Sequence, residues 1–279
     1  MGTVKQFRPV PEPGAADAAP RSGTATSLSV RSVDLQYGGP QGTLALDRVS
    51  FEVPENQFCV LVGPSGCGKS SLLYLIAGLH EVTNGTIAVN GKQVDEPGRD
   101  RGMVFQSYTL FPWLTVRENV EYGPKRQGMD AATRRAIADR FLAEVGLTQF
   151  ADHHPSQLSG GMKQRVAIAR ALANDPDVLL MDEPFGALDS QTRGVMQKLL
   201  LRVWEHSHKT VLFVTHDIDE AILLGDRVLV MTARPGRIKA DLLVDIPRPR
   251  SMDMVLEPEF IALKRKIIGL LHDEIDEEH

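Results

Sequence analysis

The segment from Gly63 to Ser70 holds residues that could bind a polyphosphate. It reads Gly-Pro-Ser-Gly-Cys-Gly-Lys-Ser and lies between an apolar run and a helical stretch, which is the pattern and setting of a phosphate loop. Glycines let backbone N–H groups converge on phosphate oxygens, and the start of the next helix adds the positive end of a dipole. We expect Lys69 to reach the β- and γ-phosphates and the Ser70 hydroxyl to bind Mg²⁺. The predicted contacts in this loop are Gly63, Pro64, Ser65, Gly66, Cys67, Gly68, Lys69, Ser70 and Ser71.

Two acidic residues follow a second apolar run. Val178 to Met181 is typical of a buried strand, and Asp182 and Glu183 stand at its carboxyl end, where α/β sheets bind their ligands. Asp182 suits Mg²⁺ coordination through water, and Glu183 is then placed to polarise an attacking water molecule. With the phosphate loop, these acids predict a nucleotide hydrolase but do not say which kind.

A third motif begins a helix with small residues. Leu158-Ser-Gly-Gly-Met-Lys-Gln-Arg165 places a serine at a helix N-cap ahead of two glycines, which makes a second anion-binding helix start. One chain thus has one phosphate loop and two helix starts suited to phosphate. The segment resembles the signature motif of the ATP-binding cassette (ABC) family and differs from it at Met162.

This resemblance, which covers roughly residues 28–250, implies a two-subunit nucleotide site. In the family, two cassettes face head to tail, and the signature of one closes over the ATP held by the other. Asp189, within Ala187-Leu-Asp189, resembles the residue of the loop that contacts the opposite subunit. The signature residues that would contact the partner's nucleotide are Ser159, Gly160, Gly161 and Gln164.

The resemblance also implies catalytic residues outside the three motifs. Gln106 is similar to the glutamine that senses Mg²⁺ and water and links to a transmembrane partner. His216 is similar to the switch histidine that contacts the γ-phosphate and helps to hold water beside Glu183, and Tyr37 to the aromatic residue that stacks on adenine. The expected catalytic set is therefore Lys69, Gln106, Glu183 and His216, with Ser70, Gln106 and Asp182 at the metal.

The alternation of strand-like and helical segments predicts an α/β fold. The resemblance specifies a P-loop NTPase cassette with a RecA-like mixed sheet core, an antiparallel β subdomain and an inserted helical subdomain at about residues 107–174. A strand at 86–89 is flanked by the turn dipeptides Asn84-Gly85 and Asn90-Gly91. Further expected strands are 58–62, 103–105, 178–181, 211–214 and 228–231, and expected helices are 70–77, 130–145, 162–173, 191–205, 218–224 and 258–272.

The expected organisation has three parts. Residues 1–26 form a flexible tail without the pattern of a secretory signal, residues 27–250 form the cassette, and residues 251–279 form a C-terminal helix whose acidic end frays. No apolar run is long enough to span a bilayer. A net charge of -5 gives no bulk attraction to nucleic acid. Two cysteines do not indicate a disulfide framework, which fits a reducing cytosol.

Cys67 calls for a prediction of its own. It lies at a helix start beside Lys69, a setting that lowers a thiol pKa and makes the thiol open to alkylation. A small filler of the loop is the alternative interpretation.

The transport role and its alternative are separated by spacing. Soluble cassette ATPases of DNA repair insert long coiled coils before the signature, whereas only about 50 residues without sustained heptads separate Gln106 from Leu158. Translation-type members carry two cassettes in one chain, and this chain has one. A transport ATPase is favoured, and a soluble ABC-type ATPase of DNA repair or translation stays the alternative.

Three segments are similar to the importer subfamily that serves nitrate, sulfonate and taurine. They are residues 107–116, which are rich in bulky apolar side chains, residues 233–238 and residues 246–250. The resemblance implies a homodimer that binds ATP and Mg²⁺, transmembrane permease subunits, a separate solute-binding protein and a peripheral place on the cytoplasmic face of the membrane. The solute does not touch this subunit, so the sequence does not reveal which solute is carried.

Overall fold

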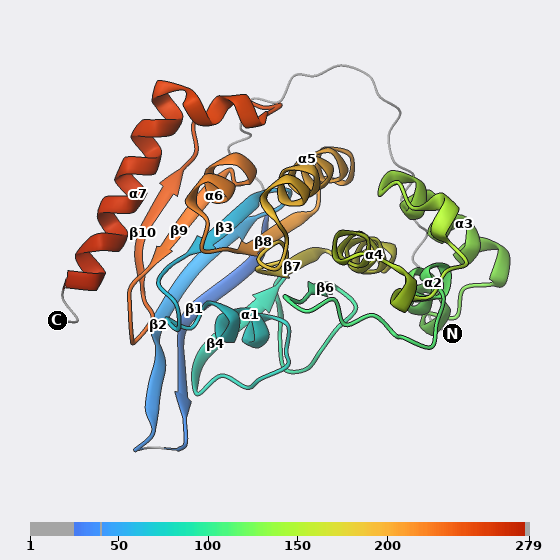
Figure 1. Ribbon diagram of the computed structural model, residues 1–279. Coiled ribbons are helices and arrows are strands. Elements are labelled where there is room, and N and C mark those ends of the chain that lie inside the picture. The colour runs from blue at the N-terminus through green and yellow to red at the C-terminus, as the bar shows by residue number, and fades with distance from the viewer. Residues whose placement is uncertain (1–24, 40, 277–279) are drawn as a thin grey trace.

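A six-stranded sheet in the order β10-β9-β3-β8-β7-β6 forms the centre of the fold (Figure 1). The computed structural model describes residues 25–39 and 41–276. The five strands from β9 to β6 are parallel, and β10 is antiparallel to β9. The strands are β3 (Phe58–Val62), β6 (Arg101–Val104), β7 (Val178–Asp182), β8 (Thr210–Val214), β9 (Arg227–Met231) and β10 (Ile238–Leu243).

A second, antiparallel sheet in the order β2-β1-β4-β5 lies beside the first. Asn90 and Gly91 join β4 to β5 with φ angles of 49° and 74°, as a two-residue hairpin turn requires, so the predicted turn is confirmed. Asn84 and Gly85 were expected to form a turn but open β4 instead, where Asn84 pairs with Asp34 of β1 and Gly85 lies at a shift of register. The strands are β1 (Thr26–Tyr37), β2 (Thr43–Pro54), β4 (Asn84–Val89) and β5 (Lys92–Gln93).

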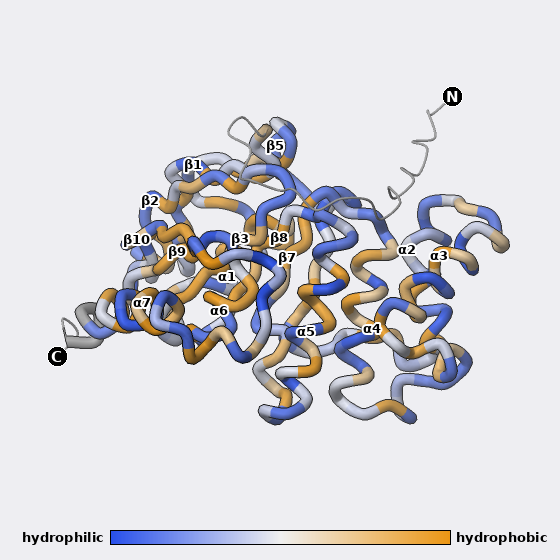
Figure 2. The backbone as a smooth tube through the Cα atoms, turned by 90° about the horizontal axis from the view of Figure 1, so that it is seen from above, coloured by the Kyte–Doolittle hydropathy of each residue, from blue (hydrophilic) through white to orange (hydrophobic). Residues whose placement is uncertain are grey.

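Helices cover the central sheet and extend beyond its edge. In Figure 1, α2, α3 and α4 lie together beyond the edge strand β6, and α7 lies along α6 and β9 at the opposite end. Hydrophobic and hydrophilic stretches alternate along α4 and α5 in Figure 2, as in helices with one face on a core. The helices are α1 (Lys69–Ile76), α2 (Val116–Arg126), α3 (Ala131–Glu144), α4 (Gly160–Ala173), α5 (Ser190–Ser207), α6 (Ile218–Leu224) and α7 (Pro258–Asp276), with short 3₁₀ turns at Thr148–Phe150, Pro155–Gln157 and Met252–Leu256.

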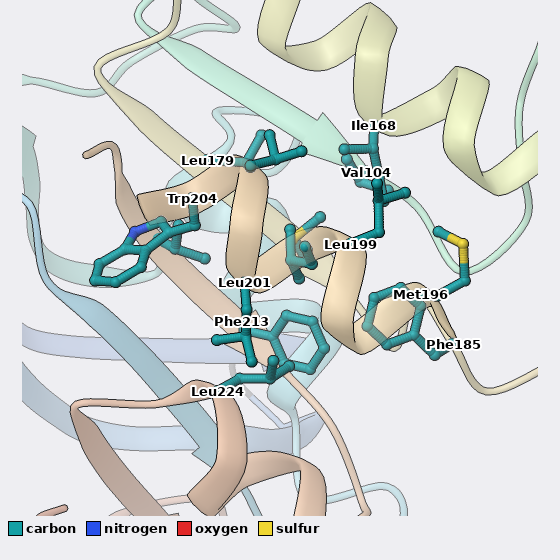
Figure 3. Packing of buried hydrophobic residues seen from close by; sticks show 14 of the residues in the cluster. Val104, Ile168, Leu179, Phe185, Met196, Leu199, Leu201, Trp204, Phe213 and Leu224 are labelled. Atoms are coloured by element: carbon teal, nitrogen blue, oxygen red, sulfur yellow. The ribbon is translucent and has the colours of Figure 1, made fainter. Parts of the chain in front are cut away.

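The apolar core has two parts, one on each face of the central sheet. Alternate residues of β3 point to opposite faces: Phe58 and Val60 join α4, α5 and α6, whereas Cys59 and Leu61 join α1 and the antiparallel sheet. The Phe58 ring lies 5.6 Å from that of Trp204 and 5.8 Å from that of Phe213. Figure 3 shows side chains of α5 and neighbouring elements interlocking on that face. Because β3 is buried on both faces, its carboxyl end is held rigidly.

Most predicted elements agree with the structure to within two residues, and helix α7 is the exception. Helix α2 was not predicted; its start is fixed by a capping box in which Thr115 and Glu118 bond to each other's backbone N–H. Strand β10 was also missed. Helix α7 continues to Asp276, four residues beyond the predicted end. The predicted tail at 1–26 lies outside the described residues apart from Ala25 and Thr26, as do the last three residues of the acidic end.

No helix within residues 25–39 and 41–276 is both long and apolar enough to cross a membrane.

Candidate functional site

The loop after β3 is shaped by glycine and closed by a lysine. Gly68 has a φ of 99° and caps α1 in the left-handed conformation, which a residue with a Cβ adopts only at a cost. The ammonium of Lys69 donates hydrogen bonds to the carbonyls of Gly63 at 2.9 Å and Pro64 at 2.8 Å. The loop thus curls around a buried cation at the start of a helix, the arrangement that binds phosphate.

The serine that follows meets the acidic end of β7. Ser70 Oγ donates to Asp182 Oδ1 at 2.8 Å, and Asp182 is almost fully buried. Burial raises the pKa of Asp182, against hydrogen bonds from Ser70 and Tyr74 that lower it. A carboxylate and a hydroxyl beside a phosphate loop are ligands that suit Mg²⁺ with nucleotide, which needs only one or two protein carboxylates. The donor set therefore fits this ion.

The second acid lies against a histidine from the next strand. His216 Nδ1 is 2.9 Å from Glu183 Oε2, and Glu183 has a φ of 41°, a strained value of the kind that gathers at functional sites. Gln106 approaches the same corner, because a Cβ built on Gly186 would lie 3.6 Å from Glu183 Oε2 and 3.8 Å from Gln106 Nε2. Three predicted catalytic side chains, from three loops, therefore converge.

A pocket of about 360 Å³ opens above this loop. Tyr37 stands at its rim, with its hydroxyl donating to Ser71 Oγ at 3.0 Å. Arg234 also lines it and was not predicted. A larger cavity of about 660 Å³ lies beside Asp177 and Lys209, at the amino end of the strands, whereas α/β sheets bind ligands at the carboxyl end. The predicted residues that line the smaller pocket are Tyr37, Ser65, Gly66, Gly68, Lys69, Ser70, Ser71 and Glu183.

The signature motif is not part of that pocket. Ser159 caps α4 by accepting from Met162 N, and a Cβ on Gly160 or Gly161 would lie 2.8 Å from the Tyr108 hydroxyl or the Thr192 methyl. Among the residues that the structure describes as lining the pocket, none belongs to 158–165. One protomer therefore keeps its signature apart from its own phosphate loop.

Two further predicted site residues, Gln164 and Asp189, differ in their exposure to solvent. Gln164 is fully buried within α4 in the single chain, and its contact with a partner's nucleotide stays a prediction. Asp189 is exposed and caps α5 by accepting from Thr192 N at 2.9 Å. That backbone N–H is the main reason why the pKa of Asp189 is lowered.

The prediction that Cys67 has a lowered thiol pKa is wrong. Its side chain is buried, with 1% exposed, and this desolvation raises the thiol pKa against the opposing charge of Lys69. The reason is that the Lys69 ammonium is directed to the loop carbonyls, with the sulfur 3.9 Å away. The alternative, a small filler of the loop, agrees with the structure.

Comparisons with known proteins identify the family. Residues 46–186 match the family model described as ABC transporter. The chain is 46% identical over 258 residues to the nitrate import ATP-binding protein of Synechocystis, covering 90% of this chain and 97% of that one. It is 49% identical over 237 residues to the taurine import ATP-binding protein of Rhizobium johnstonii, covering 83% and 90%.

A solved structure extends the comparison to the fold. It is a dimeric ATP-binding cassette in a post-hydrolysis state, bound to ADP and Pi, with a TM-score of 0.69 and 36% identity over 79% of this chain and 100% of that chain. The chain therefore belongs to the ABC transporter family. Within it, this protein is the ATP-binding subunit that hydrolyses ATP, and the predicted family, fold class and enzymatic activity are confirmed.

Proposed function

We propose that two copies of this chain close head to tail over ATP and Mg²⁺. The observation that carries the proposal is the division within one protomer: the phosphate loop, Asp182 and Glu183 share a pocket, and the signature does not contribute to it. Ser159 and Gly161 of one copy would complete the phosphate site of the other, and Asp189 would contact the opposite subunit. The solved relative, which is itself dimeric, supports this assembly.

Hydrolysis in this site rests on the side chains that meet at the carboxyl ends of β7 and β8. Lys69 and the loop N–H groups bind the phosphates, Tyr37 stacks on adenine, and Glu183 accepts a proton from the attacking water. His216 and Gln106 hold that water and the γ-phosphate in place. Ser70, Asp182 and Gln106 would hold Mg²⁺, which offsets charge on the phosphates when it is bound. Loss of the γ-phosphate would remove the contact that joins the two copies.

The apolar segment before α2 supports docking on a permease. Trp113 is 71% exposed, and the Phe111 ring contacts both Trp113 and Tyr122, at centroid distances of 5.7 and 4.5 Å. An exposed aromatic group of this kind marks an interaction site. We place the chain at the cytoplasmic face of the membrane, held there by permease subunits that receive the ATP-driven motion.

The importer class is proposed from likeness to relatives. Two relatives that match along 97% and 90% of their own length are named for nitrate and taurine import. They favour import of a small solute of the nitrate, sulfonate or taurine kind, delivered by a solute-binding protein. The same matches favour transport over DNA repair or translation.

Affinity purification from membranes of the source cells tests this function. Tagged wild-type chain should bring down an integral membrane permease and its solute-binding protein, whereas Trp113→Ala should lose the permease and keep its own ATPase activity. An ATPase that needs DNA and never copurifies with a permease would contradict the transport role.

A further inference from the structure

The turn between β9 and β10 is closed by its own hydrogen bonds. Thr232 N donates to Arg237 O at 2.9 Å, and Arg237 N donates to the Thr232 hydroxyl, also at 2.9 Å. That hydroxyl in turn donates to Pro235 O at 2.8 Å. Residues 232–237 therefore form a turn whose backbone is closed by its own hydrogen bonds.

This turn is fastened to β2 and pressed against the phosphate loop. Gly236 N donates to Ala45 O at 2.9 Å, and Asp47 N donates to Gly236 O at 3.1 Å. A Cβ on Gly236 would collide with the carbonyl oxygen of Cys67, so only glycine allows this approach. The turn and the loop that binds phosphate thus form one unit.

The turn directs Arg234 into the nucleotide pocket. Arg234 Nε donates to Gly66 O at 3.0 Å, and the guanidinium lies so close to Gly66 that a Cβ there would collide with it. The structure gives Arg234 no second hydrogen bond within the described residues. Its two terminal amino groups therefore keep donors that can serve a ligand.

Lys69 and Arg234 are the cations among the described residues that line the pocket. The Lys69 ammonium is bound by two loop carbonyls. Arg234 is exposed at the rim, on the side of Ser65 and Gly66. A planar guanidinium presents paired donors that match phosphate oxygens in a bidentate way.

We propose that Arg234 binds the phosphate groups of ATP. The inference rests on the proposed nucleotide site and adds a residue to it. The Nε bond to Gly66 fixes the side chain, and the terminal amino groups contact phosphate oxygen. The turn at 232–237 is accordingly a part of the nucleotide site that lies far along the chain from the phosphate loop.

The competing explanation is that Arg234 only supports the phosphate loop through its hydrogen bond to Gly66. One substitution distinguishes this role from phosphate binding. Arg234→Gln keeps an N–H donor at the place of Nε and removes the guanidinium, so a brace survives while a phosphate ligand is lost. Arg234→Ala removes both. Arg31→Ala is the matched control for charge, because Arg31 is 71% exposed and pairs with Glu52 on the antiparallel sheet.

Binding of fluorescent ATP and ADP analogues to each purified variant, at two salt concentrations, is the test. We expect Arg234→Gln and Arg234→Ala each to weaken nucleotide binding by about tenfold or more, because each loses a charged hydrogen bond to phosphate. The affinity of these variants should also depend less on the salt concentration than that of the wild type. Arg31→Ala should bind like wild type, and all variants should keep the wild-type melting temperature.

Wild-type affinity in Arg234→Gln would overturn the proposal and leave a brace as the role of Arg234. If the wild-type chain itself binds neither analogue, the proposed nucleotide site fails instead, so the two failures are distinguishable.

Discussion

Nδ1 of His216 lies 2.9 Å from Oε2 of Glu183, although 33 positions separate them in the chain. The contact follows from the sheet: β7 and β8 are parallel neighbours with Asp182 paired to Val214, and each residue stands just beyond the end of its strand. The histidine side chain is 57% exposed and the glutamate 20%. Glu183 lines the nucleotide pocket, and the histidine is the more exposed member of the pair.

The first prediction concerns Glu183. Glu183→Gln keeps the size of the side chain but cannot accept a proton, so ATP binding should persist while hydrolysis slows by roughly 10²- to 10⁴-fold, which is about 3 to 5 kcal/mol of barrier. Phosphate release and equilibrium ATP binding measure the two effects. Near wild-type turnover in this variant would show that Glu183 does not accept the proton of the attacking water.

The second prediction concerns the coupling of the pair. If His216 acts by holding Glu183 and its water, His216→Ala should slow hydrolysis strongly, and the double variant with Glu183→Gln should be little slower than the slower single variant. Effects that multiply in the double variant would show that the two residues act independently.

The sequence predicted the buried strands of the central sheet well, because each of them is a short run of apolar residues. Strands β3, β7 and β8 are buried along their whole length and were predicted to within one residue. Helix α2 escaped prediction because Gly123 and Pro124 break its pattern, while Pro124 is buried and tolerated within it. Tertiary packing there outweighs intrinsic propensity.

The site shows the same division. The spacing of motif residues located the phosphate loop and the acids at the end of β7, because residues that are close together in the sequence also lie close together in the folded chain. It did not reveal that Gln164 and Cys67 are buried, or that Arg234 returns from the end of β9 to touch Gly66. Those facts depend on which elements pack together. The sequence feature that could have pointed to Arg234 is the short segment after β9, which holds Arg234, Gly236 and Arg237.

The third prediction concerns the thiols. Cys59 and Cys67 are the two cysteines of the chain and both are buried; burial raises the pKa of Cys59 to about 12 and also raises that of Cys67. A chromogenic disulfide reagent at pH 8 should therefore react slowly with the native protein and rapidly with both thiols in denaturant. One fast thiol in the native protein that is absent from Cys67→Ala would contradict the buried arrangement.

The fourth prediction concerns Glu220, a buried acid of α6 that accepts from Gln197 Nε2 at 2.9 Å. Burial is the main reason why its pKa is raised above the unfolded value of about 4.3. The folded state therefore holds this proton more tightly, and the stabilisation is complete below about pH 4.3 and is lost as the pH rises through the raised pKa. Glu220→Gln is always neutral and keeps an oxygen for Gln197, so the free energy of unfolding should fall less over this range.

Urea unfolding of both proteins from pH 4 to 8 measures the difference. Glu118→Gln is a control of opposite sign, because hydrogen bonds from the Thr115 backbone and side chain lower the pKa of Glu118. Its native stabilisation is present above about pH 4.3 and is lost on acidification, so this variant should differ most from wild type at neutral pH. If the unfolding free energy of Glu220→Gln follows that of the wild type at every pH, the pKa of Glu220 is not raised in the folded protein and the prediction is wrong.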